Sequence, residues 1–375
     1  MAAFTSYKPV SGHLEILDRG FGFLRQIHRN YQPGPTDPFV PETLIADLGL
    51  RDGAWIEGRG RSGGADQTNL KLVVIHEING ISLSEYAKIE PIHTLTSINP
   101  DQRLDMCLGP SDLTGQVLNL IVPMGRGQRG LIISPPKSGK TTLLRHMANA
   151  ISRNHPDMDL FVLLVNERPE EVTDFKRGLE SGHVLFSSSD QSAGHHIRIA
   201  RLAVSTALRC AETGRDAVVL IDSLTRMARA FNAETESQGR VLSGGLGATA
   251  MEVPRRIFGA ARNIEEGGSV TIVATILVDT GSRMDEVIFQ EFRGTGNMDV
   301  VLSRECAENR VFPAIDIPKS GTRKEEQLLD GVTLKKAREI RQVLVDKSPT
   351  EAMVDLLAHL DRTSGNPKKI TRPAF

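Results

Sequence analysis

A short loop with the residues needed to bind phosphate lies at Ser134-Pro-Pro-Lys-Ser-Gly-Lys-Thr141. It follows the apolar run GLIIS and precedes TTLLRHMANAISR, in which apolar residues recur at helical spacing. In such a strand–loop–helix unit, backbone N–H groups and the helix N-terminus surround the phosphates of a nucleotide. Ser134 stands where the full pattern has its first glycine, so a surface turn before an ordinary helix is the alternative. We predict a nucleotide site formed by Ser138, Gly139, Lys140, Thr141 and Thr142.

Two acidic residues at strand ends would complete this site. Asp222 ends the apolar run AVVLID, and Glu167 follows LFVLLVN. Carboxylates at the carboxyl edge of a parallel sheet lie beside the nucleotide crevice, although either acid alone is more often a helix cap or a surface charge. Lys140 would reach the β- and γ-phosphates, while Thr141 and Asp222 would hold Mg²⁺. Glu167 is our candidate for polarising the attacking water.

The composition limits the classes of protein to which the chain can belong. It has 375 residues, 39% hydrophobic and 24% charged, which excludes wholesale disorder. No apolar run approaches the roughly 20 residues of a membrane helix, and the N-terminus lacks a secretory signal pattern. Three scattered cysteines argue against a disulfide framework or a metal site, so we expect a reducing cytoplasm. With 45 Lys and Arg against 46 Asp and Glu, nucleic acid could be bound only through local patches.

The elements that must position these residues fall into two folded units. Residues 1–80 carry short alternating runs between Gly, Pro and Asp clusters, which predicts a small antiparallel β-barrel. Residues 81–119 contain several prolines and read as a connector. In residues 120–375, apolar runs of strand length alternate with helical segments, which predicts an α/β domain with a parallel sheet.

The predicted barrel carries Gly20-Phe-Gly-Phe-Leu-Arg25, in which alternation places Phe21 and Phe23 on one face of a strand. The glycines would leave both rings uncovered, and single-stranded bases stack on such rings. A pair of phenylalanines packed into a core is the alternative. We predict an RNA-binding surface formed by Phe21, Phe23, Arg25 and Tyr31.

Long stretches of the chain resemble one known family, the bacterial transcription termination factor Rho. The matching motifs are GRGQRGLIISPPKSGKTTLL, NERPEEVTDF, VVLIDSLTRMARAFN, FGAARNIEEGGS, DTGSRMDEVIFQEFRGTGNM and RVFPAIDIPKSGTRKEE, and the resemblance extends from about Gly12 to beyond Leu329. It implies an OB-fold barrel of the cold-shock type and a RecA-like P-loop ATPase domain, assembled as a homohexamer. It also implies an RNA-dependent ATPase and helicase that uses ATP and Mg²⁺, binds nascent RNA and terminates transcription, with RNA polymerase and an elongation factor as further partners.

The resemblance also implies roles for single residues. Phe312 resembles the residue that stacks on adenine. Arg323 is similar to the arginine finger that reaches the γ-phosphate in a neighbouring subunit, although the residues alone would favour a salt bridge with Glu325 or Glu326. Other positions that match nucleotide-binding or interface residues of the family are Lys137, Arg168 and Arg226.

Two loops match those that grip RNA in the centre of the family's ring. Leu242–Ala250 contains Gly244 and Gly245, and the segment from Thr280 to Met284 contains Arg283. Glycines let a loop approach a sugar–phosphate backbone, and an arginine supplies charge. Loop flexibility alone is the alternative explanation for the glycines.

The chain also departs from the family pattern. Gln67-Thr68-Asn69 stands where the family's barrel has Glu-Arg-Tyr, so we expect weak cytosine selectivity, with less than about tenfold preference for poly(C) over poly(U). Asn166 replaces an aspartate, which should lower the pKa of Glu167 relative to the family's carboxylate without loss of activity. The chain begins close to the barrel, so we expect the contacts of the helical module that often precedes it to be missing.

Two rival functions remain open from the sequence. One is a ring ATPase that acts on protein or protons, which would not need the paired phenylalanines or the arginine of the central loop. The other is a Rho-like clamp that binds RNA with little turnover, against which the retained Lys140, Glu167 and Arg323 argue. Turnover measured with and without RNA separates these possibilities.

Overall fold

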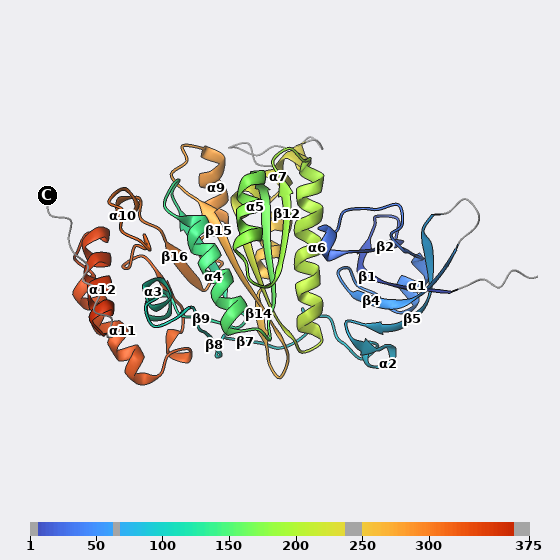
Figure 1. Cartoon of the computed structure of the whole chain (residues 1–375), viewed down its shortest axis with the longest axis horizontal. Coiled ribbons are helices and arrows are strands. Elements are labelled where there is room, and N and C mark those ends of the chain that lie inside the picture. The colour runs from blue at the N-terminus through green and yellow to red at the C-terminus, as the bar shows by residue number, and fades with distance from the viewer. Residues whose placement is uncertain (1–6, 63–67, 237–249, 364–375) are drawn as a thin grey trace, which may run out of the picture.

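Two main sheets organise the chain, an antiparallel barrel near the N-terminus and a larger, mostly parallel sheet after it (Figure 1). The computed structural model describes residues 7–62, 68–236 and 250–363. In Figure 1 the barrel lies beside helix α6 (Ala193–Glu212), while the C-terminal helices lie at the other end of the molecule. This arrangement confirms the fold class predicted from the sequence, an α/β domain preceded by a small β-barrel.

The barrel has the strand order β3-β2-β1-β4-β5-β6, and an additional pairing of β3 with β5 closes it. Alternate side chains such as Leu14, Leu24 and Ile56 fill its interior. The sheet continues to Ser82, past residue 80, at which the sequence placed the end of the first unit. Its elements are β1 (Lys8–Ile16), β2 (Gly22–Arg25), the short helix η1 (Ile27–Arg29), β3 (Phe39–Val40), α1 (Glu42–Asp47), β4 (Trp55–Ser62), β5 (Leu70–Ile78), β6 (Ile81–Ser82) and α2 (Leu83–Tyr86).

The larger sheet has the order β12-β11-β13-β15-β10-β16-β17, in which all pairings are parallel except the last. Because helices cover both faces, its central strands read as continuous apolar runs rather than alternating ones. The strands are β10 (Arg129–Ser134), β11 (Asp159–Glu167), β12 (His183–Ser188), β13 (Asp216–Asp222), β15 (Ser269–Leu277), β16 (Met298–Val301) and β17 (Gly321–Thr322). Two further strands lie off this order: β14 (Arg262–Ile264) pairs antiparallel with β15, and β7 (Ser97–Ile98) pairs antiparallel with β14.

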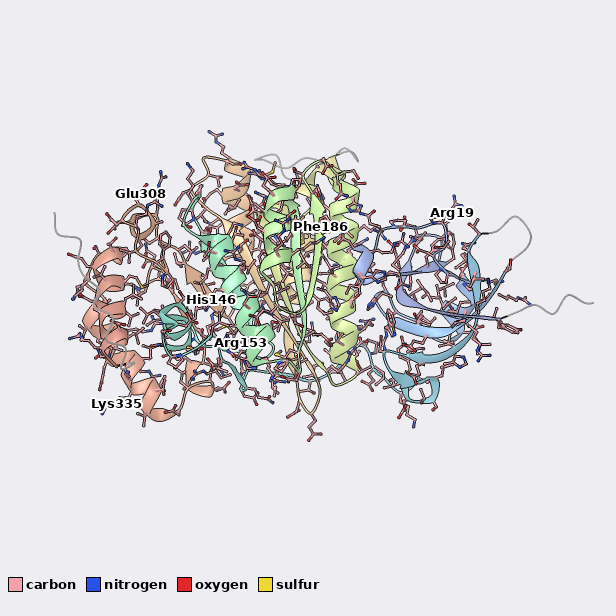
Figure 2. All side chains as sticks on the ribbon, viewed as in Figure 1. Arg19, His146, Arg153, Phe186, Glu308 and Lys335 are labelled. Atoms are coloured by element: carbon pink, nitrogen blue, oxygen red, sulfur yellow. The ribbon has the colours of Figure 1, made fainter. Side chains whose placement is uncertain are left out.

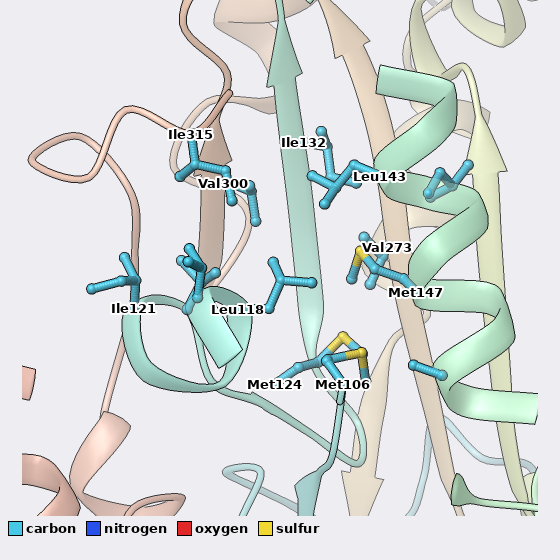
Figure 3. Packing of buried hydrophobic residues seen from close by; sticks show 14 of the residues in the cluster. Met106, Leu118, Ile121, Met124, Ile132, Leu143, Met147, Val273, Val300 and Ile315 are labelled. Atoms are coloured by element: carbon cyan, nitrogen blue, oxygen red, sulfur yellow. The ribbon is translucent and has the colours of Figure 1, made fainter. Parts of the chain in front are cut away.

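Adjacent residues of each central strand point to opposite faces and enter two separate cores. Ile132 and Val273 face one core, and Leu131 and Ile272 face the other. In Figure 3, Met147 of α4 packs towards Val273 in the first of these cores. The first core is covered by α3 (Leu113–Ile121), α4 (Lys140–Asn154), α5 (Pro169–Gly178), α10 (Arg304–Glu308), α11 (Gly331–Leu344) and α12 (Pro349–Thr363). The second is covered by α6, α7 (Leu224–Glu236), α8 (Glu252–Gly259) and α9 (Arg283–Phe292).

The segment between the barrel and the sheet is ordered by pairing with the larger domain. Within it, β7 extends the sheet through β14, and β8 (Arg103–Leu104) pairs with β9 (Met124–Gly125). A further short helix, η2 (Glu325–Gln327), precedes α11. Across the described ranges, none of the helices combines the length and apolar character that crossing a membrane requires.

Direct contacts join the barrel to α6 and β12. The Tyr31 hydroxyl lies 3.0 Å from the Thr206 hydroxyl. The Asn30 side chain donates to the Phe186 carbonyl at 2.7 Å and accepts from its N–H at 2.9 Å. A Cβ added to Gly53 would lie 2.5 Å from Thr206 N, so only glycine permits this approach of the two backbones. The barrel is therefore packed onto the α/β domain through side chains and main chain alike.

Candidate functional site

The loop predicted to bind phosphate connects β10 to α4 and is braced by its own hydroxyls. Ser134 is buried, and its hydroxyl lies 2.8 Å from that of Ser138, which donates to the Pro135 carbonyl at 2.8 Å. Lys137 (φ 63°) is exposed, and Gly139 (φ 89°) adopts the left-handed conformation that favours glycine. No described side chain caps the N-terminus of α4, so its first N–H groups are available to an anion.

The side chains of Lys140 and Thr141 meet Asp222 at the carboxyl edge of the sheet, as predicted. Lys140 Nζ forms an ion pair with Asp222 Oδ1, and Thr141 Oγ1 donates to Oδ2 at 3.4 Å. Thr275 of β15 donates to Oδ1 at 2.9 Å and thereby orients the buried carboxylate. The sequence did not single out Thr275, because a threonine in an apolar strand gives no sign of its cross-strand partner.

The donors at this point fit Mg²⁺ shared with the phosphates of a nucleotide. The Thr141 hydroxyl and the Asp222 carboxylate are oxygen ligands of the kind that Mg²⁺ accepts, and this ion usually takes its remaining ligands from substrate phosphates and water. Within the described part of the chain, no three His, Cys, Asp or Glu side chains are grouped so as to hold a metal by themselves. We therefore assign Thr141 and Asp222 as the side chains that would hold the ion.

Glu167, the last residue of β11, is 1% exposed and lies beside two cations. Arg226 Nη1 is 2.5 Å from Glu167 Oε1, and Lys140 Nζ is 3.9 Å from the same oxygen. Burial raises the pKa of Glu167, and the charge of Asp222 raises it further, while Arg226 and Lys140 act in the opposite direction. A raised pKa makes this carboxylate a stronger base, which suits a group that polarises water.

Asn166 holds the backbone in the unusual conformation that precedes Glu167. Its φ is 54°, and the pairing of β11 with β12 is irregular at this point. Asparagine adopts this left-handed region more readily than most residues. Its carbonyl accepts a hydrogen bond from Arg226 at 2.7 Å, and Arg168 follows, exposed, at the N-cap of α5. Although residue 166 is not a carboxylate, the pKa of Glu167 still lies above its ordinary value, because burial raises it.

A cavity of about 260 Å³ opens beside the phosphate loop, with Phe312 at its edge. Phe312 is 49% exposed, and a Cβ on Gly139 would lie 3.5 Å from its ring. His146 of α4, which is labelled in Figure 2, also lines the cavity. The remaining walls include Thr142, Leu143, Leu302 and Pro313. An open aromatic ring beside an apolar pocket and a phosphate loop is the arrangement that a flat base with attached phosphates requires.

Arg323 lies at the opposite edge of the sheet from the phosphate loop of its own chain. Its backbone N–H donates to the carbonyl of Asn297, the residue just before β16, at 2.8 Å. The first residue of β16, Met298, pairs with Gly130 at the start of β10, whereas the phosphate loop follows the end of β10. Arg323 is exposed and makes no ion pair with a described residue, since Glu325 instead faces Arg338 at 3.6 Å. The salt bridge considered from the sequence is therefore not formed.

Arg283 is exposed at the start of α9, beside a loop that a buried carboxylate holds in place. Arg229 of α7 donates to the two oxygens of Asp285 at 2.8 and 2.6 Å, and Thr280 donates to Asp285 at 2.6 Å. The pairing of Arg229 with Asp285 could not be found from the sequence, because 56 residues separate the two. The predicted RNA-contacting residues Gly244 and Gly245 lie outside the described residues.

Three phenylalanines form a partly exposed cluster on the barrel. Phe21 and Phe23 lie on one face, as predicted, with their ring centroids 5.9 Å apart. Phe39 of β3, which the sequence analysis did not single out, completes the cluster at 5.5 Å from Phe21 and 5.8 Å from Phe23. We refer to Phe21, Phe23 and Phe39 as the aromatic cluster. None of these rings belongs to the buried core of the barrel, which argues against the core alternative.

Arg25 and Tyr31 are not part of this exposed surface, which argues against the prediction that they contact RNA. Arg25 is 6% exposed because it forms buried ion pairs with Glu15 at 2.5 Å and Asp37 at 2.6 Å. Tyr31 is fully buried between the barrel and α6, where its hydroxyl meets that of Thr206. Both residues therefore support the surface from within.

The segment that replaces the family's cytosine-reading residues is described only in part. Gln67 lies outside the described residues. Thr68 is exposed, and its hydroxyl donates to the Pro35 carbonyl at 2.9 Å, while Asn69 is partly buried. The Thr68 hydroxyl is thus engaged with backbone, which reduces its capacity to read a base edge. The weak cytosine selectivity stays a prediction.

Comparisons with known proteins agree with both units of the structure. Residues 115–322 match the family described as ATP synthase alpha/beta family, nucleotide-binding domain, and residues 10–84 match the Rho termination factor, RNA-binding domain. The chain is 46% identical over 359 residues to transcription termination factor Rho of Escherichia coli strain K12, covering 95% of this chain and 85% of that protein. It is 47% identical over 360 residues to the protein of the same name from Aquifex aeolicus strain VF5, covering 95% and 83%.

A solved structure shares the fold at lower identity. It is described as a prototypical ATPase from the type III secretion system of pathogenic bacteria. The TM-score is 0.60 with 24% identity, and the match covers 71% of this chain and 75% of the other. At this identity the likeness concerns the fold alone.

Proposed function

The chain belongs to the family of transcription termination factor Rho, and from this premise we propose that it is an ATP-driven RNA translocase and helicase that binds nascent RNA and terminates transcription. The observation that carries the proposal is the convergence of Lys140, Thr141, Asp222 and Glu167 at one sheet edge, in a chain that also displays an aromatic cluster. The first feature suits ATP hydrolysis, and the second suits single-stranded RNA.

In the proposed reaction each residue of the nucleotide site has a distinct task. The N–H groups at the start of α4 and the Lys140 ammonium bind the phosphates, and the Phe312 ring receives the adenine. Mg²⁺ held by Thr141 and Asp222 would neutralise charge that develops on the phosphates. Glu167 orients the attacking water and accepts its proton at Oε1 or Oε2.

We propose that Arg323 completes the site of a neighbouring subunit. Its exposure, its lack of an ion pair with any described residue and its position at the far edge of the sheet all support a role outside its own site. A guanidinium supplied by a neighbour would stabilise the transition state and make hydrolysis depend on assembly. We infer a homohexameric ring, in line with the family resemblance.

Helix α7 provides a route by which hydrolysis could move the central loop. Arg226 and Arg229 lie one helical turn apart on α7. Arg226 pairs with Glu167, and Arg229 pairs with Asp285, which is two residues after Arg283. A change in the charge around Glu167 that displaces Arg226 would therefore be passed along α7 to the segment that carries Arg283. Since Arg283 is exposed, it is available for a phosphate of RNA.

The site of action follows from the proposed function. A factor that terminates transcription acts on the transcript while RNA polymerase is present, so we place the protein in the cytoplasm. Assistance by an elongation factor would be consistent with this role.

The likeness to a secretion ATPase raises a second candidate, a ring ATPase that acts on protein. The aromatic cluster and the exposed Arg283 favour RNA, because an ATPase acting on protein needs neither. A clamp that binds RNA without turnover is the third possibility. The arrangement of Lys140, Asp222 and Glu167 favours turnover.

ATP hydrolysis measured with and without single-stranded RNA tests the proposal. We expect RNA to stimulate turnover, and Lys140→Ala to reduce the stimulated rate by about 10² to 10³-fold or more, because the phosphates lose their cation. RNA affinity at the barrel should be unchanged, since Lys140 contacts Asp222 and Glu167 and no described residue of the barrel. Arg153→Ala, in the last turn of α4 (Figure 2), is a matched control that should retain turnover. Turnover that is indifferent to RNA would refute the proposed function.

A further inference from the structure

A buried network of charges joins the barrel strand that carries Glu15 to helix α6 of the larger domain. Glu15 of β1 is 6% exposed and lies between two arginines. On the barrel side, Arg25 Nε donates to Glu15 Oε2 at 2.5 Å, and Arg25 Nη1 donates to Asp37 Oδ2 at 2.6 Å. On the other side, Arg198 of α6 contacts both Glu15 oxygens, with its Nη2 2.8 Å from Oε2. The same Nη2 donates to the Tyr31 carbonyl at 2.6 Å.

The network reaches the aromatic cluster through Arg25. The guanidinium carbon of Arg25 is 4.7 Å from the centroid of the Phe23 ring, within the range of a cation–π contact. Phe23 in turn packs against Phe21 and Phe39. The Arg25 side chain therefore supports Phe23 from the buried side, and the position of that ring depends on the carboxylates that hold Arg25.

Removing one member of this network would rearrange the others. Glu15 divides its single negative charge between Arg25, whose side chain is 7% exposed, and Arg198, whose side chain is 22% exposed. Buried ion pairs respond strongly to the loss of a partner, because the remaining charges have no water to replace it. Without Arg198, both oxygens of Glu15 would be free to bind Arg25, which would be drawn away from Asp37 and from the Phe23 ring.

We propose that Arg198 is a positioning residue for RNA capture. From the ATPase domain it acts through Glu15 and Arg25 to hold the aromatic cluster in the arrangement that receives bases. The inference rests on the proposed function, in which this cluster binds RNA. It implies that the RNA affinity of the barrel depends on its docking against α6, so that neither domain alone defines the RNA site.

Binding of a short fluorescent oligouridylate and oligocytidylate to the full chain, measured by anisotropy without nucleotide, tests the proposal. We expect Arg198→Met to raise the dissociation constant about tenfold, and Arg198→Lys to raise it by about threefold, because lysine keeps the charge but loses the two-pronged contact. The matched control is Arg201→Met, which removes an exposed arginine one turn along α6 that makes no ion pair with a described residue. Its affinity should be unchanged. Melting temperatures of all variants report on folding.

The double variant separates positioning from a general loss of stability. If Arg198 acts through the cluster, Arg198→Met should weaken binding little further in a Phe23→Ala background, since the ring that it positions is gone. An unchanged affinity of Arg198→Met, or full additivity with Phe23→Ala, would overturn the inference while leaving the role of the cluster intact. Unchanged affinity in Phe23→Ala alone would instead overturn the base-binding role of the cluster and the inference with it. Should Arg198→Met not fold, the graded loss in Arg198→Lys decides the same question.

Discussion

The nucleotide site and the RNA-binding barrel differ in how directly local sequence determines which side chains are presented. In the nucleotide site, Lys140, Glu167 and Asp222 come from three separate segments and meet at one edge of the sheet. In the barrel, Arg25 and Tyr31 are near neighbours of the phenylalanines in sequence, yet both turn inward. A parallel sheet collects the carboxyl ends of its strands at one edge regardless of side-chain packing. The exposed face of a barrel strand, by contrast, depends on everything that packs against it, here including a second domain.

The largest expected effect tests whether the nucleotide site is complete within one chain. Arg323→Ala should lower RNA-stimulated ATP hydrolysis by about 10³-fold, because the transition state loses a guanidinium supplied by the neighbour. Mixing Arg323→Ala with Lys140→Ala protein should restore part of the activity. In mixed rings, some interfaces combine an intact phosphate loop from one subunit with an intact Arg323 from the next.

Arg338→Ala serves as the control for the Arg323 experiment, since it removes an exposed arginine that faces Glu325 in the same region. It should hydrolyse ATP at close to the normal rate. If mixing the two inactive variants restores nothing although they assemble together, Arg323 does not act across a subunit interface. The nucleotide site would then be formed by one chain alone, and it would differ from the barrel only in its local geometry.

A smaller effect should separate the exposed and buried aromatic residues of the barrel. Phe39→Ala should weaken RNA binding by about 1–3 kcal/mol, because a base loses a stacking surface. Tyr31→Phe should leave RNA affinity unchanged and lower the melting temperature slightly, because it removes only the hydrogen bond to Thr206. Anisotropy titrations and thermal melts of both variants check this pair. Weaker RNA binding in Tyr31→Phe, with Phe39→Ala unaffected, would reverse the assignment of exposed and buried roles.

The parts that could be predicted from the sequence are those that local pattern determines. The phosphate loop and the acids at strand ends follow from apolar runs and their neighbours, and the alternation that places Phe21 beside Phe23 is equally local. The addition of Phe39 depends on the pairing of β2 with β3, which no single strand reveals. The burial of Arg25 could not be predicted, because it requires Glu15 and Asp37 to lie within one barrel.

Contacts between the two units were the least predictable. The pairing of Arg198 with Glu15 joins residues 183 positions apart, and the contact of Tyr31 with Thr206 spans 175. Their side chains have the ordinary types of a helix surface and a strand end, so nothing in either segment indicates a partner. Such contacts form where the surfaces of two folded domains pack together, which is a property of the tertiary structure.

The smallest expected effect concerns the cost of holding Glu167 in the nucleotide site. Since burial raises its pKa, the folded chain binds the Glu167 proton more tightly than the unfolded chain does. This contribution to stability is fully present below the pKa of the unfolded state and is lost as the pH rises through the folded-state pKa. At neutral pH the ionised carboxylate should therefore reduce the stability of the nucleotide-free protein, and Glu167→Gln should relieve that loss. The buried charge of the nucleotide site would thus weaken the fold in the absence of ligand, in contrast to the mutually paired charges beneath the aromatic cluster.

Melting temperatures of the nucleotide-free protein across the acidic to neutral range measure this cost. Glu167→Gln should melt about 1–3 °C higher than the unchanged protein at neutral pH, and the difference should disappear or reverse towards acidic pH, where Glu167 is protonated. Glu170→Gln, which changes an exposed glutamate at the start of α5, is the matched control and should show no such trend. Parallel pH profiles for Glu167→Gln and the unchanged protein would mean that Arg226 and Lys140 fully compensate the buried carboxylate. The nucleotide site would then resemble the charge network of the barrel, in which each buried ion has its partner.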